Sequence, residues 1–273
     1  MQYTHVIWKA LLFAVLWQMT MAVGHTQGLD LLNLQQNMPM RMQDAYAIPE
    51  HALSVDLAID VGVNDRSSDW LQTRTQVEYG IAPGLQGVVG LRSVWSDYDE
   101  TGNGDIYVEI LKQIYETPRD ALAAEIKLNF PTGQDYARAD TSIPGFNFVV
   151  DPRQEEIDFW LGAVYTRVLQ KPARTRLHAQ VQRGFINSAP RGADPNRWFL
   201  SLGADHLIAP DTLLMANLWW EESAKLTATD SMALQVGLRR RQTPRLIWAV
   251  SLNLGLGWEL ADCGGALSAQ YGF

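Results

Sequence analysis

Residues 102–133 read GNGDIYVEILKQIYETPRDALAAEIKLNFPTG, and this stretch decides the fold. Two runs within it alternate between apolar and polar residues, the period of a β-strand with one apolar and one polar face. The apolar positions are Ile106, Val108, Ile110 and Ile114 in the first run and Ala124, Ile126, Leu128 and Phe130 in the second. Between the runs, residues 117–120 (Thr-Pro-Arg-Asp) have turn chemistry. The stretch therefore predicts a β-hairpin.

The same alternation recurs from residue 53 to the last residue, and it predicts about twelve strands of roughly 10 to 13 residues, the length at which a tilted strand crosses a bilayer. Their apolar rows run over residues 53–63, 71–81, 87–95, 106–114, 124–130, 157–165, 177–185, 200–208, 214–220, 234–238, 246–256 and 267–273. Backbone groups in hydrocarbon must all be hydrogen-bonded, so a sheet that spans a membrane must close on itself. We therefore expect an all-β fold, a transmembrane antiparallel β-barrel with its apolar rows toward lipid and its polar rows toward the lumen.

The connections between the predicted strands alternate in length. Residues 82–84 and 209–211 form tight turns, whereas 97–104, 186–196 and 131–156 are long and rich in polar residues. Short periplasmic turns and long external loops are typical of outer-membrane barrels. This pattern places residues 136–152 outside the cell and residues 171–174 in the periplasm.

Composition agrees with a barrel and excludes other classes. Charged residues make up 19% of the 273 residues and the mean hydropathy is −0.12, too polar for a bundle of membrane helices. The formal charge of −8 argues against a nucleic-acid partner. The single cysteine, Cys263, excludes an internal disulfide.

The N-terminal 51 residues do not share the strand pattern. Residues 1–24 have the layout of a secretory signal peptide, with a charge at Lys9, an apolar core and small residues at the end. The apolar run is shorter than the ~20 residues that a membrane-spanning helix needs, so we expect export and no retained anchor. Residues 25–51, rich in Gln, Met and Asn, form a leader that we expect to be either periplasmic or tucked into the lumen. The barrel itself should occupy residues 52–273.

Residues 104–110 (GDIYVEI) and 124–133 (AEIKLNFPTG) resemble the outer-membrane family of MetA-pathway phenol-degradation proteins. In that family a Gly-Asp opens one strand, here Gly104 and Asp105, and a Lys-Leu-Pro-Thr-Gly-like run closes the next. The resemblance covers residues 52–273. It implies an outer-membrane barrel and a transporter-like role in moving hydrophobic or aromatic compounds.

The end of the chain carries a second resemblance. Phe273, preceded by Tyr271, resembles the signal that the outer-membrane assembly machinery reads. We therefore expect the partners of this protein to be that machinery, outer-membrane lipid and a small-molecule cargo. The expected location is the outer membrane of a Gram-negative bacterium.

The polar rows carry charges of both signs, so no simple ion preference follows. The candidate binding residues that line the lumen are Arg74, Glu78, Arg92, Asp105, Glu109, Glu125, Lys127, Asp158, Arg176, His178 and Arg239. Unpaired charge in a poorly hydrated space is costly, so we expect Arg74 and Arg92 to pair with glutamates on the same inner surface. The glutamates concerned are Glu78, Glu109 and Glu125. Such a lumen is either a narrow channel or a closed network of salt bridges.

An acidic stretch at residues 97–105 has the spacing of an EF-hand calcium loop around Gly102. Val108, however, stands where the bidentate glutamate belongs, and strands flank the stretch instead of helices. We expect an acidic surface loop and no metal site.

A catalytic constellation is also conceivable, because His178, Ser201 and Asp205 belong to neighbouring predicted strands. A Ser-His-Asp hydrolase needs these groups in one particular geometry, and no Gly-x-Ser-x-Gly motif accompanies them. We expect His178 to be a lumen residue, and we expect neither enzymatic activity nor a cofactor.

Three functions remain open in order of preference. The first is a channel or transporter for small compounds, among them hydrophobic or aromatic ones. The second is a non-conducting barrel with a structural, lipid-binding or surface-interaction role. The third is a membrane-embedded hydrolase.

Overall fold

The computed structural model describes residues 29–35, 38–63, 69–96, 101–130, 132, 157–170, 175–185, 196–223, 230–256 and 263–273. The predicted signal peptide at residues 1–24 lies outside these ranges. So do the predicted external residues 136–152, the predicted periplasmic residues 171–174, and residues 97–100 of the acidic stretch.

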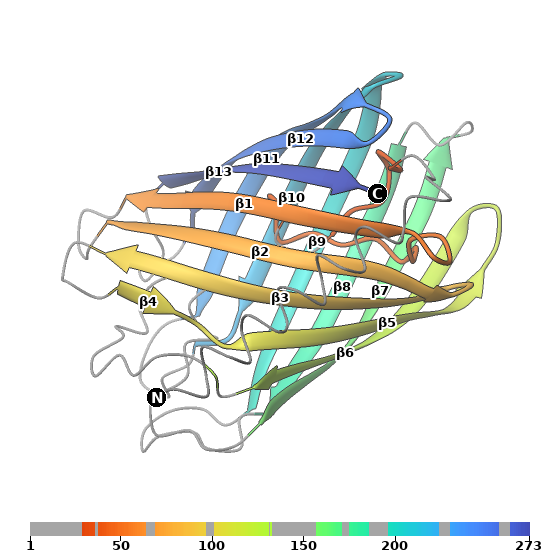
Figure 1. Ribbon diagram of the computed structural model, residues 1–273. Coiled ribbons are helices and arrows are strands. Elements are labelled where there is room, and N and C mark those ends of the chain that lie inside the picture. The colour runs from red at the N-terminus through yellow and green to blue at the C-terminus, as the bar shows by residue number, and fades with distance from the viewer. Residues whose placement is uncertain are drawn as a thin grey trace.

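The described residues form thirteen strands, of which twelve are long and β4 is short (Figure 1). Their bounds are β1 Leu53–Val63, β2 Trp70–Ala82, β3 Leu85–Ser96, β4 Thr101–Asn103, β5 Ile106–Glu116, β6 Asp120–Phe130, β7 Asp158–Gln170, β8 Thr175–Phe185, β9 Asn196–Ala209, β10 Thr212–Glu221, β11 Ser231–Thr243, β12 Leu246–Gly255 and β13 Cys263–Gly272. The hairpin predicted from residues 102–133 is the pair β5–β6.

The sheet closes into a barrel through antiparallel pairing. β1 pairs with β2 on one side and with β13 on the other, so the first and last strands meet. β2 pairs with β3, β3 pairs with β5, and each later long strand pairs with the next along the chain. β4 adds to β3 beyond the β3–β5 pairing. The predicted transmembrane barrel of about twelve strands is confirmed, and closure leaves no long strand edge unpaired.

Side chains alternate between the two faces of every long strand as the sequence pattern predicts. In β1, Leu57 is 54% exposed and Ile59 48%, whereas Asp56 and Ala58 are each 2% exposed. Each of the twelve long strands carries at least one exposed large apolar side chain. A continuous apolar belt of this extent would aggregate in water, and it suits the hydrocarbon of a bilayer.

The two ends of the barrel differ in their connections. At the end that we call the turn end, β2 joins β3 at Pro83-Gly84, β9 joins β10 at Pro210-Asp211, and β11 joins β12 at Pro244-Arg245. At the opposite end, which we call the loop end, the connections between strands are longer. Among the described residues, no helix is long and apolar enough to cross a membrane.

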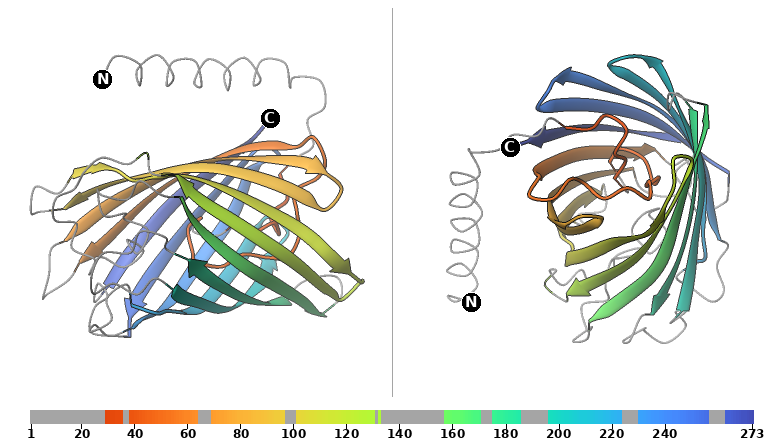
Figure 2. Two further views of the ribbon diagram at one scale, coloured as in Figure 1. Left: turned by 90° about the horizontal axis from the view of Figure 1, so that it is seen from below. Right: turned by 90° about the vertical axis from the view of Figure 1, so that its right-hand side faces the viewer.

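Residues 29–35 and 38–51, which we call the N-terminal segment, run into the barrel, and most of them lie inside it (Figure 2). At one end of the segment, the backbone N–H of Leu29 donates to the carbonyl of Pro244 at 2.8 Å. At the other end, His51 N–H donates to the carbonyl of Gly80 at 2.8 Å. Both anchors belong to the turn end, so the segment enters the lumen and returns on the same side before β1 begins.

Candidate functional site: the occupied lumen

The eleven candidate lumen residues are all buried, ten of them on the inner faces of strands and Asp105 directly before β5. None of them is more than 9% exposed, and they are Arg74, Glu78, Arg92, Asp105, Glu109, Glu125, Lys127, Asp158, Arg176, His178 and Arg239. Alternation alone directs these side chains toward the lumen and does not bury them. They are buried in part because the N-terminal segment contacts the inner wall and covers part of it. Their role in binding a compound stays a prediction.

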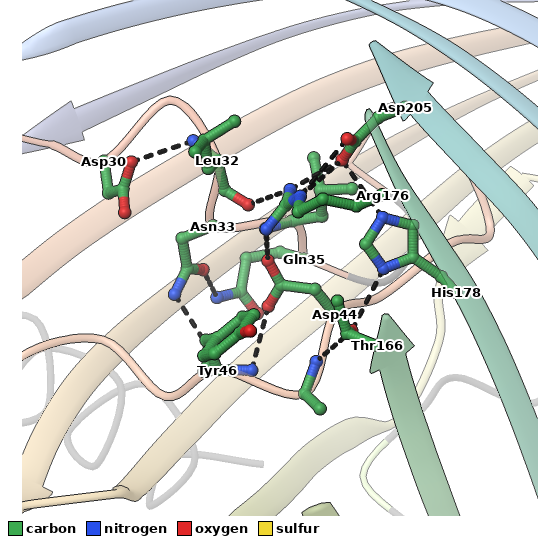
Figure 3. A network of polar contacts seen from close by, with 12 residues as sticks. Asp30, Leu32, Asn33, Gln35, Asp44, Tyr46, Thr166, Arg176, His178 and Asp205 are labelled. Carbon is green, nitrogen blue, oxygen red and sulfur yellow. Dashed lines mark hydrogen bonds and ion pairs between the residues drawn. The ribbon is translucent and has the colours of Figure 1, made fainter. Parts of the chain in front are cut away.

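Arg176 of β8 is the main electrostatic link between the wall and the segment (Figure 3). Its guanidinium lies 2.6 Å from the Asp205 carboxylate of β9 and 3.1 Å from the Asp44 carboxylate of the segment. It also donates to the backbone carbonyl of Leu32. The guanidinium is therefore shared by two buried carboxylates, one on the wall and one on the segment, and it also binds a carbonyl of the segment. A buried charge needs such partners.

His178 supports the same network from the next inward position of β8. Its Nε2 lies 3.0 Å from the Asp205 carboxylate, and its Nδ1 lies 3.1 Å from the hydroxyl of Thr166 (Figure 3). The Thr166 hydroxyl in turn accepts a hydrogen bond from the backbone N–H of Ala45 at 2.9 Å. His178 thus positions the Asp205 carboxylate and the Thr166 hydroxyl, and the Thr166 hydroxyl binds the backbone of the segment.

Amide side chains connect the segment to the wall elsewhere. Gln43 donates to the Glu109 carboxylate at 3.1 Å and accepts from Gln180 at 3.0 Å. The backbone N–H of Ile48 donates to the side-chain carbonyl of Gln86 at 2.9 Å. These contacts link the segment to β3, β5 and β8.

Apolar packing adds to this attachment. Leu31, Leu34, Met40 and Met42 of the segment pack against buried apolar residues of the wall, which are Leu213, Met215 and Ile247. The wall makes room for the methionines with small residues. A Cβ on Gly203 would lie 2.1 Å from Met42 Sδ, and one on Gly237 would lie 2.8 Å from Met40 Sδ. The segment and the wall therefore fit closely.

The ion pairs in the lumen differ from those that the sequence predicts. Arg74 pairs with Asp60 at 2.5 Å, and not with a glutamate. Arg92 lies with its guanidinium carbon 5.6 Å from the ring centre of Tyr107. The expectation for Arg74 was wrong because Asp60 lies diagonally across the β1–β2 ladder, a proximity that depends on strand register.

The predicted glutamate partners accept hydrogen bonds from neutral donors. Glu78 accepts from the hydroxyl of Ser54 at 3.0 Å. Glu125 accepts from the amides of Gln180 and Gln182, at 3.1 Å and 2.8 Å to its Oε1. The side chains that bind these carboxylates point inward, as the alternation in the sequence predicts. The sequence does not predict which carboxylate each of them binds.

The conceivable catalytic constellation does not assemble. His178 contacts Asp205, but the hydroxyl of Ser201 has its two acceptors elsewhere, Asn217 Oδ1 at 2.8 Å and the carbonyl of Arg41 at 3.0 Å, and shares its one hydrogen between them. Ser201 is thus directed toward the N-terminal segment. Among the residues that the structure describes, no three His, Cys, Asp or Glu side chains are placed to hold a metal ion.

Sequence reasoning missed several residues of the lumen network, namely Arg41, Asp44, Asp60 and Glu221. Asp60 occupies a polar row of β1, so its inward direction was available from alternation. Arg41 and Asp44 belong to the leader, whose place in the lumen was left open.

Comparison with solved structures finds barrels of the same kind. An outer-membrane channel from Pseudomonas putida F1 aligns over 84% of this chain and 98% of its own, with a TM-score of 0.63 and 16% identity. The KdgM porin aligns over 81% and 99%, with a TM-score of 0.56 and 10% identity. The fold is that of outer-membrane barrels.

A third barrel of this kind is the CymD monoaromatic hydrocarbon channel, which aligns over 82% of this chain and 89% of its own. Its TM-score is 0.50 at 10% identity. At sequence identities of 10 to 16%, the similarity to these three barrels shows a shared fold and nothing about function. No protein-family model and no curated protein matches the chain, so the resemblance to the phenol-degradation family is not confirmed.

Proposed function

We propose that the protein is an outer-membrane channel that admits small compounds through the barrel lumen, with the N-terminal segment as the restriction of that path. The observation that carries the proposal is that the segment contacts a polar wall without being part of the sheet. The wall is polar around its circumference, and the segment is a stretch of chain without strand or helix among its described residues. Such a segment can shift while the closed barrel keeps its own hydrogen bonds.

A small cavity beside the segment is lined by residues that include Gln35, Asp56 and Arg239, and it has a volume of about 10 Å³, room for about one water molecule. The methionines of the segment also pack closely against the wall at Gly203 and Gly237. A compound that crosses this part of the lumen therefore needs the segment to move. We infer small or gated permeation without strong ion selectivity, because the lumen carries both signs of charge.

A non-conducting barrel is the second candidate, and the close packing of the methionines against Gly203 and Gly237 favours it. In that case the segment would be a permanent part of the core. The two candidates differ in what happens when the attachment of the segment is weakened.

The experiment compares single-channel conductance of the wild type and Asp44→Ala in planar bilayers. Asp44→Ala removes the ion pair between the segment and Arg176 and leaves the Leu32 carbonyl as the remaining contact of Arg176 with the segment. Arg176 stays paired with Asp205, so the wall keeps its charge balance. The channel proposal expects measurable conductance in the wild type and more frequent or larger openings in the variant. The matched control is Asp30→Ala, which removes a carboxylate of the segment that accepts a hydrogen bond from within the segment, from Leu32 N–H at 2.9 Å. Silence of both wild type and Asp44→Ala, with the barrel intact by heat-modifiable gel mobility, would favour the non-conducting barrel.

Placement in the outer membrane of a Gram-negative bacterium is part of the same proposal. The apolar belt supports contact with lipid, and the rings of Tyr271 and Phe273 lie edge to face with centroids 5.0 Å apart at the chain end. We propose that this end is read by the outer-membrane assembly machinery. Depletion of that machinery should leave the protein unassembled in the periplasm.

A further inference from the structure

The Arg41 side chain of the N-terminal segment reaches residues near the loop end of β9 and β10, and it lies between two aromatic rings. Its guanidinium carbon is 4.4 Å from the ring centre of Phe199 and 4.2 Å from that of Trp219. Its Nη1 is 2.6 Å from a carboxylate oxygen of Glu221. Two rings and one carboxylate are the groups that recognise an organic cation.

The barrel alone supplies these three groups. Phe199 belongs to β9, and Trp219 and Glu221 belong to β10, with Phe199 directly opposite Glu221 in the ladder. All three are buried, at 0%, 4% and 0% exposure. They lie near the loop end of their strands, whereas the segment enters from the turn end. We call this group of three residues the cation cage.

The backbone on either side of the Arg41 side chain is held by neighbouring strands. Arg41 N–H donates to the Gln235 side chain at 2.8 Å, and its carbonyl accepts from Asn217 Nδ2 at 3.0 Å. The guanidinium is therefore delivered to the cage by a seated backbone. When the segment shifts, the cage remains on the wall.

The fit of Arg41 in the cage is incomplete. Within the described chain, Arg41 Nε, both Glu221 oxygens and Trp219 Nε1 are buried without a well-directed hydrogen bond. The Arg41–Glu221 contact is thus one of charge and proximity, and buried polar atoms without directed partners weaken it. A small cation that is free to rotate could align with Glu221 better than a side chain fixed to the segment.

We propose that Phe199, Trp219 and Glu221 form a binding site for a small organic cation, of the guanidinium or alkylammonium class, that Arg41 occupies from within the same chain. A compound of this class displaces the Arg41 side chain and loosens the N-terminal segment. The release of the path in this way rests on the proposed channel function, but binding to the cage does not.

The first test measures whether the segment is seated, in a Met42→Cys/Gly203→Cys variant that also carries Cys263→Ser. A Cβ on Gly203 would lie 2.9 Å from Met42 Cγ, close enough for the two cysteines to bond when the segment is in place. The rate of disulfide formation is followed in methylguanidinium and in its neutral counterpart methylurea. We expect slower bonding in methylguanidinium than in equal methylurea, because Arg41 is displaced. Equal rates in the two compounds would overturn the proposal.

The second test measures binding directly, by ligand-observed NMR in detergent micelles. Arg41→Ala empties the cage and should bind methylguanidinium more tightly than the wild type does, with no gain for methylurea. Adding Glu221→Gln to Arg41→Ala should weaken methylguanidinium binding by about tenfold, since a charge-assisted contact is lost. Equal binding by the single and double variants would contradict a cage that depends on Glu221.

These outcomes are independent of conduction. A protein that binds methylguanidinium but shows no conductance would retain the cage and lose the channel function. A conducting protein whose segment and cage ignore methylguanidinium would retain the channel and lose the cage.

Discussion

Arg176 shows how a single side chain ties the N-terminal segment to the barrel. It pairs with Asp205 of the neighbouring strand and with Asp44 of the segment, and each of these side chains is at most 3% exposed. A buried charge is stable only with its partners, because the cost of desolvation is large. The residue therefore acts on the stability of the barrel and on the position of the segment together.

Arg176→Ala should lower the free energy of unfolding by about 3–5 kcal/mol, because it leaves two buried carboxylates without their shared cation. Urea-induced unfolding of the protein in lipid vesicles measures this. The matched control is Arg240→Ala, which breaks an ion pair with Asp211 across 3.3 Å at the surface, where the side chains are 66% and 44% exposed.

The Asp211 carboxyl is already stabilised without Arg240, since its pKa is lowered first by the hydroxyl of Thr212 and then by Arg240. Solvent screens an exposed pair of this kind, so Arg240→Ala should leave the free energy of unfolding nearly unchanged. Equal effects of the two substitutions would mean that Arg176 is not a buried link.

Gly80 tests the close approach between the segment and β2. A Cβ at this position would lie 1.9 Å from the carbonyl oxygen of Pro49, which is backbone and cannot rotate away. Gly80→Ala should therefore destabilise the protein by about 1–3 kcal/mol through overpacking. Thermal unfolding measures this against Gly104→Ala, where the nearest atom lies 3.6 Å away. A cost at Gly80 no larger than at Gly104 would contradict the seated segment.

The sequence predicts the face of the sheet to which a single side chain points, but not the residue that it contacts. A period of two determines that Arg74 and Glu78 share a face, since they are four residues apart on one strand. The choice of Asp60 as the partner of Arg74 depends on how β1 is aligned with β2, and alternation does not define that alignment between strands. Asp44 could not be predicted as the partner of Arg176 because the leader has no period that positions it.

The N-terminal segment is the element whose place the sequence left open, although the barrel strands carry a trace of it. Leu213, Met215 and Ile247 interrupt the polar rows of β10 and β12 with apolar side chains. In a water-filled lumen these positions would be polar. They are apolar because they pack against Leu31, Leu34, Met40 and Met42 of the segment. Apolar residues within inward rows are thus the signal that predicts an occupied lumen.

The outward row of β12 tests the membrane-facing surface. Leu252 is 68% exposed and lies well inside its strand, opposite Val236 and Gly265. Leu252→Arg near the bilayer midplane should cost about 2–4 kcal/mol of folding free energy, because arginine is poorly solvated in hydrocarbon. Reversible unfolding in vesicles measures this cost.

The control for that substitution is an outward-facing residue at a different depth in the membrane. Ile208 is 54% exposed and lies one residue from the turn end of β9, so Ile208→Arg should cost about 0–1 kcal/mol at the interface. Equal costs at the two positions would contradict the placement of the belt in hydrocarbon.

The whole barrel was predictable because its constraints are global and repetitive. Alternation over residues 53–273, tight turns on one side and closure in hydrocarbon together predict the twelve long strands that pair in the structure. β4 was expected as loop, and its three residues are too short to show a period. The strand number does not predict whether the lumen is occupied, since a barrel of this size leaves room either for a path or for packed side chains.

The central claim is that compounds pass through the lumen and that the N-terminal segment restricts their passage. The most direct measurement is solute flux into proteoliposomes that contain the Met42→Cys/Gly203→Cys variant in the Cys263→Ser background. One protein is measured before and after oxidation, with Cys263→Ser alone as the control for the oxidant. We expect flux in the reduced state, low flux when the disulfide holds the segment in place, and recovery on reduction. Equal flux in the oxidised and reduced states, or no flux in either, would contradict it.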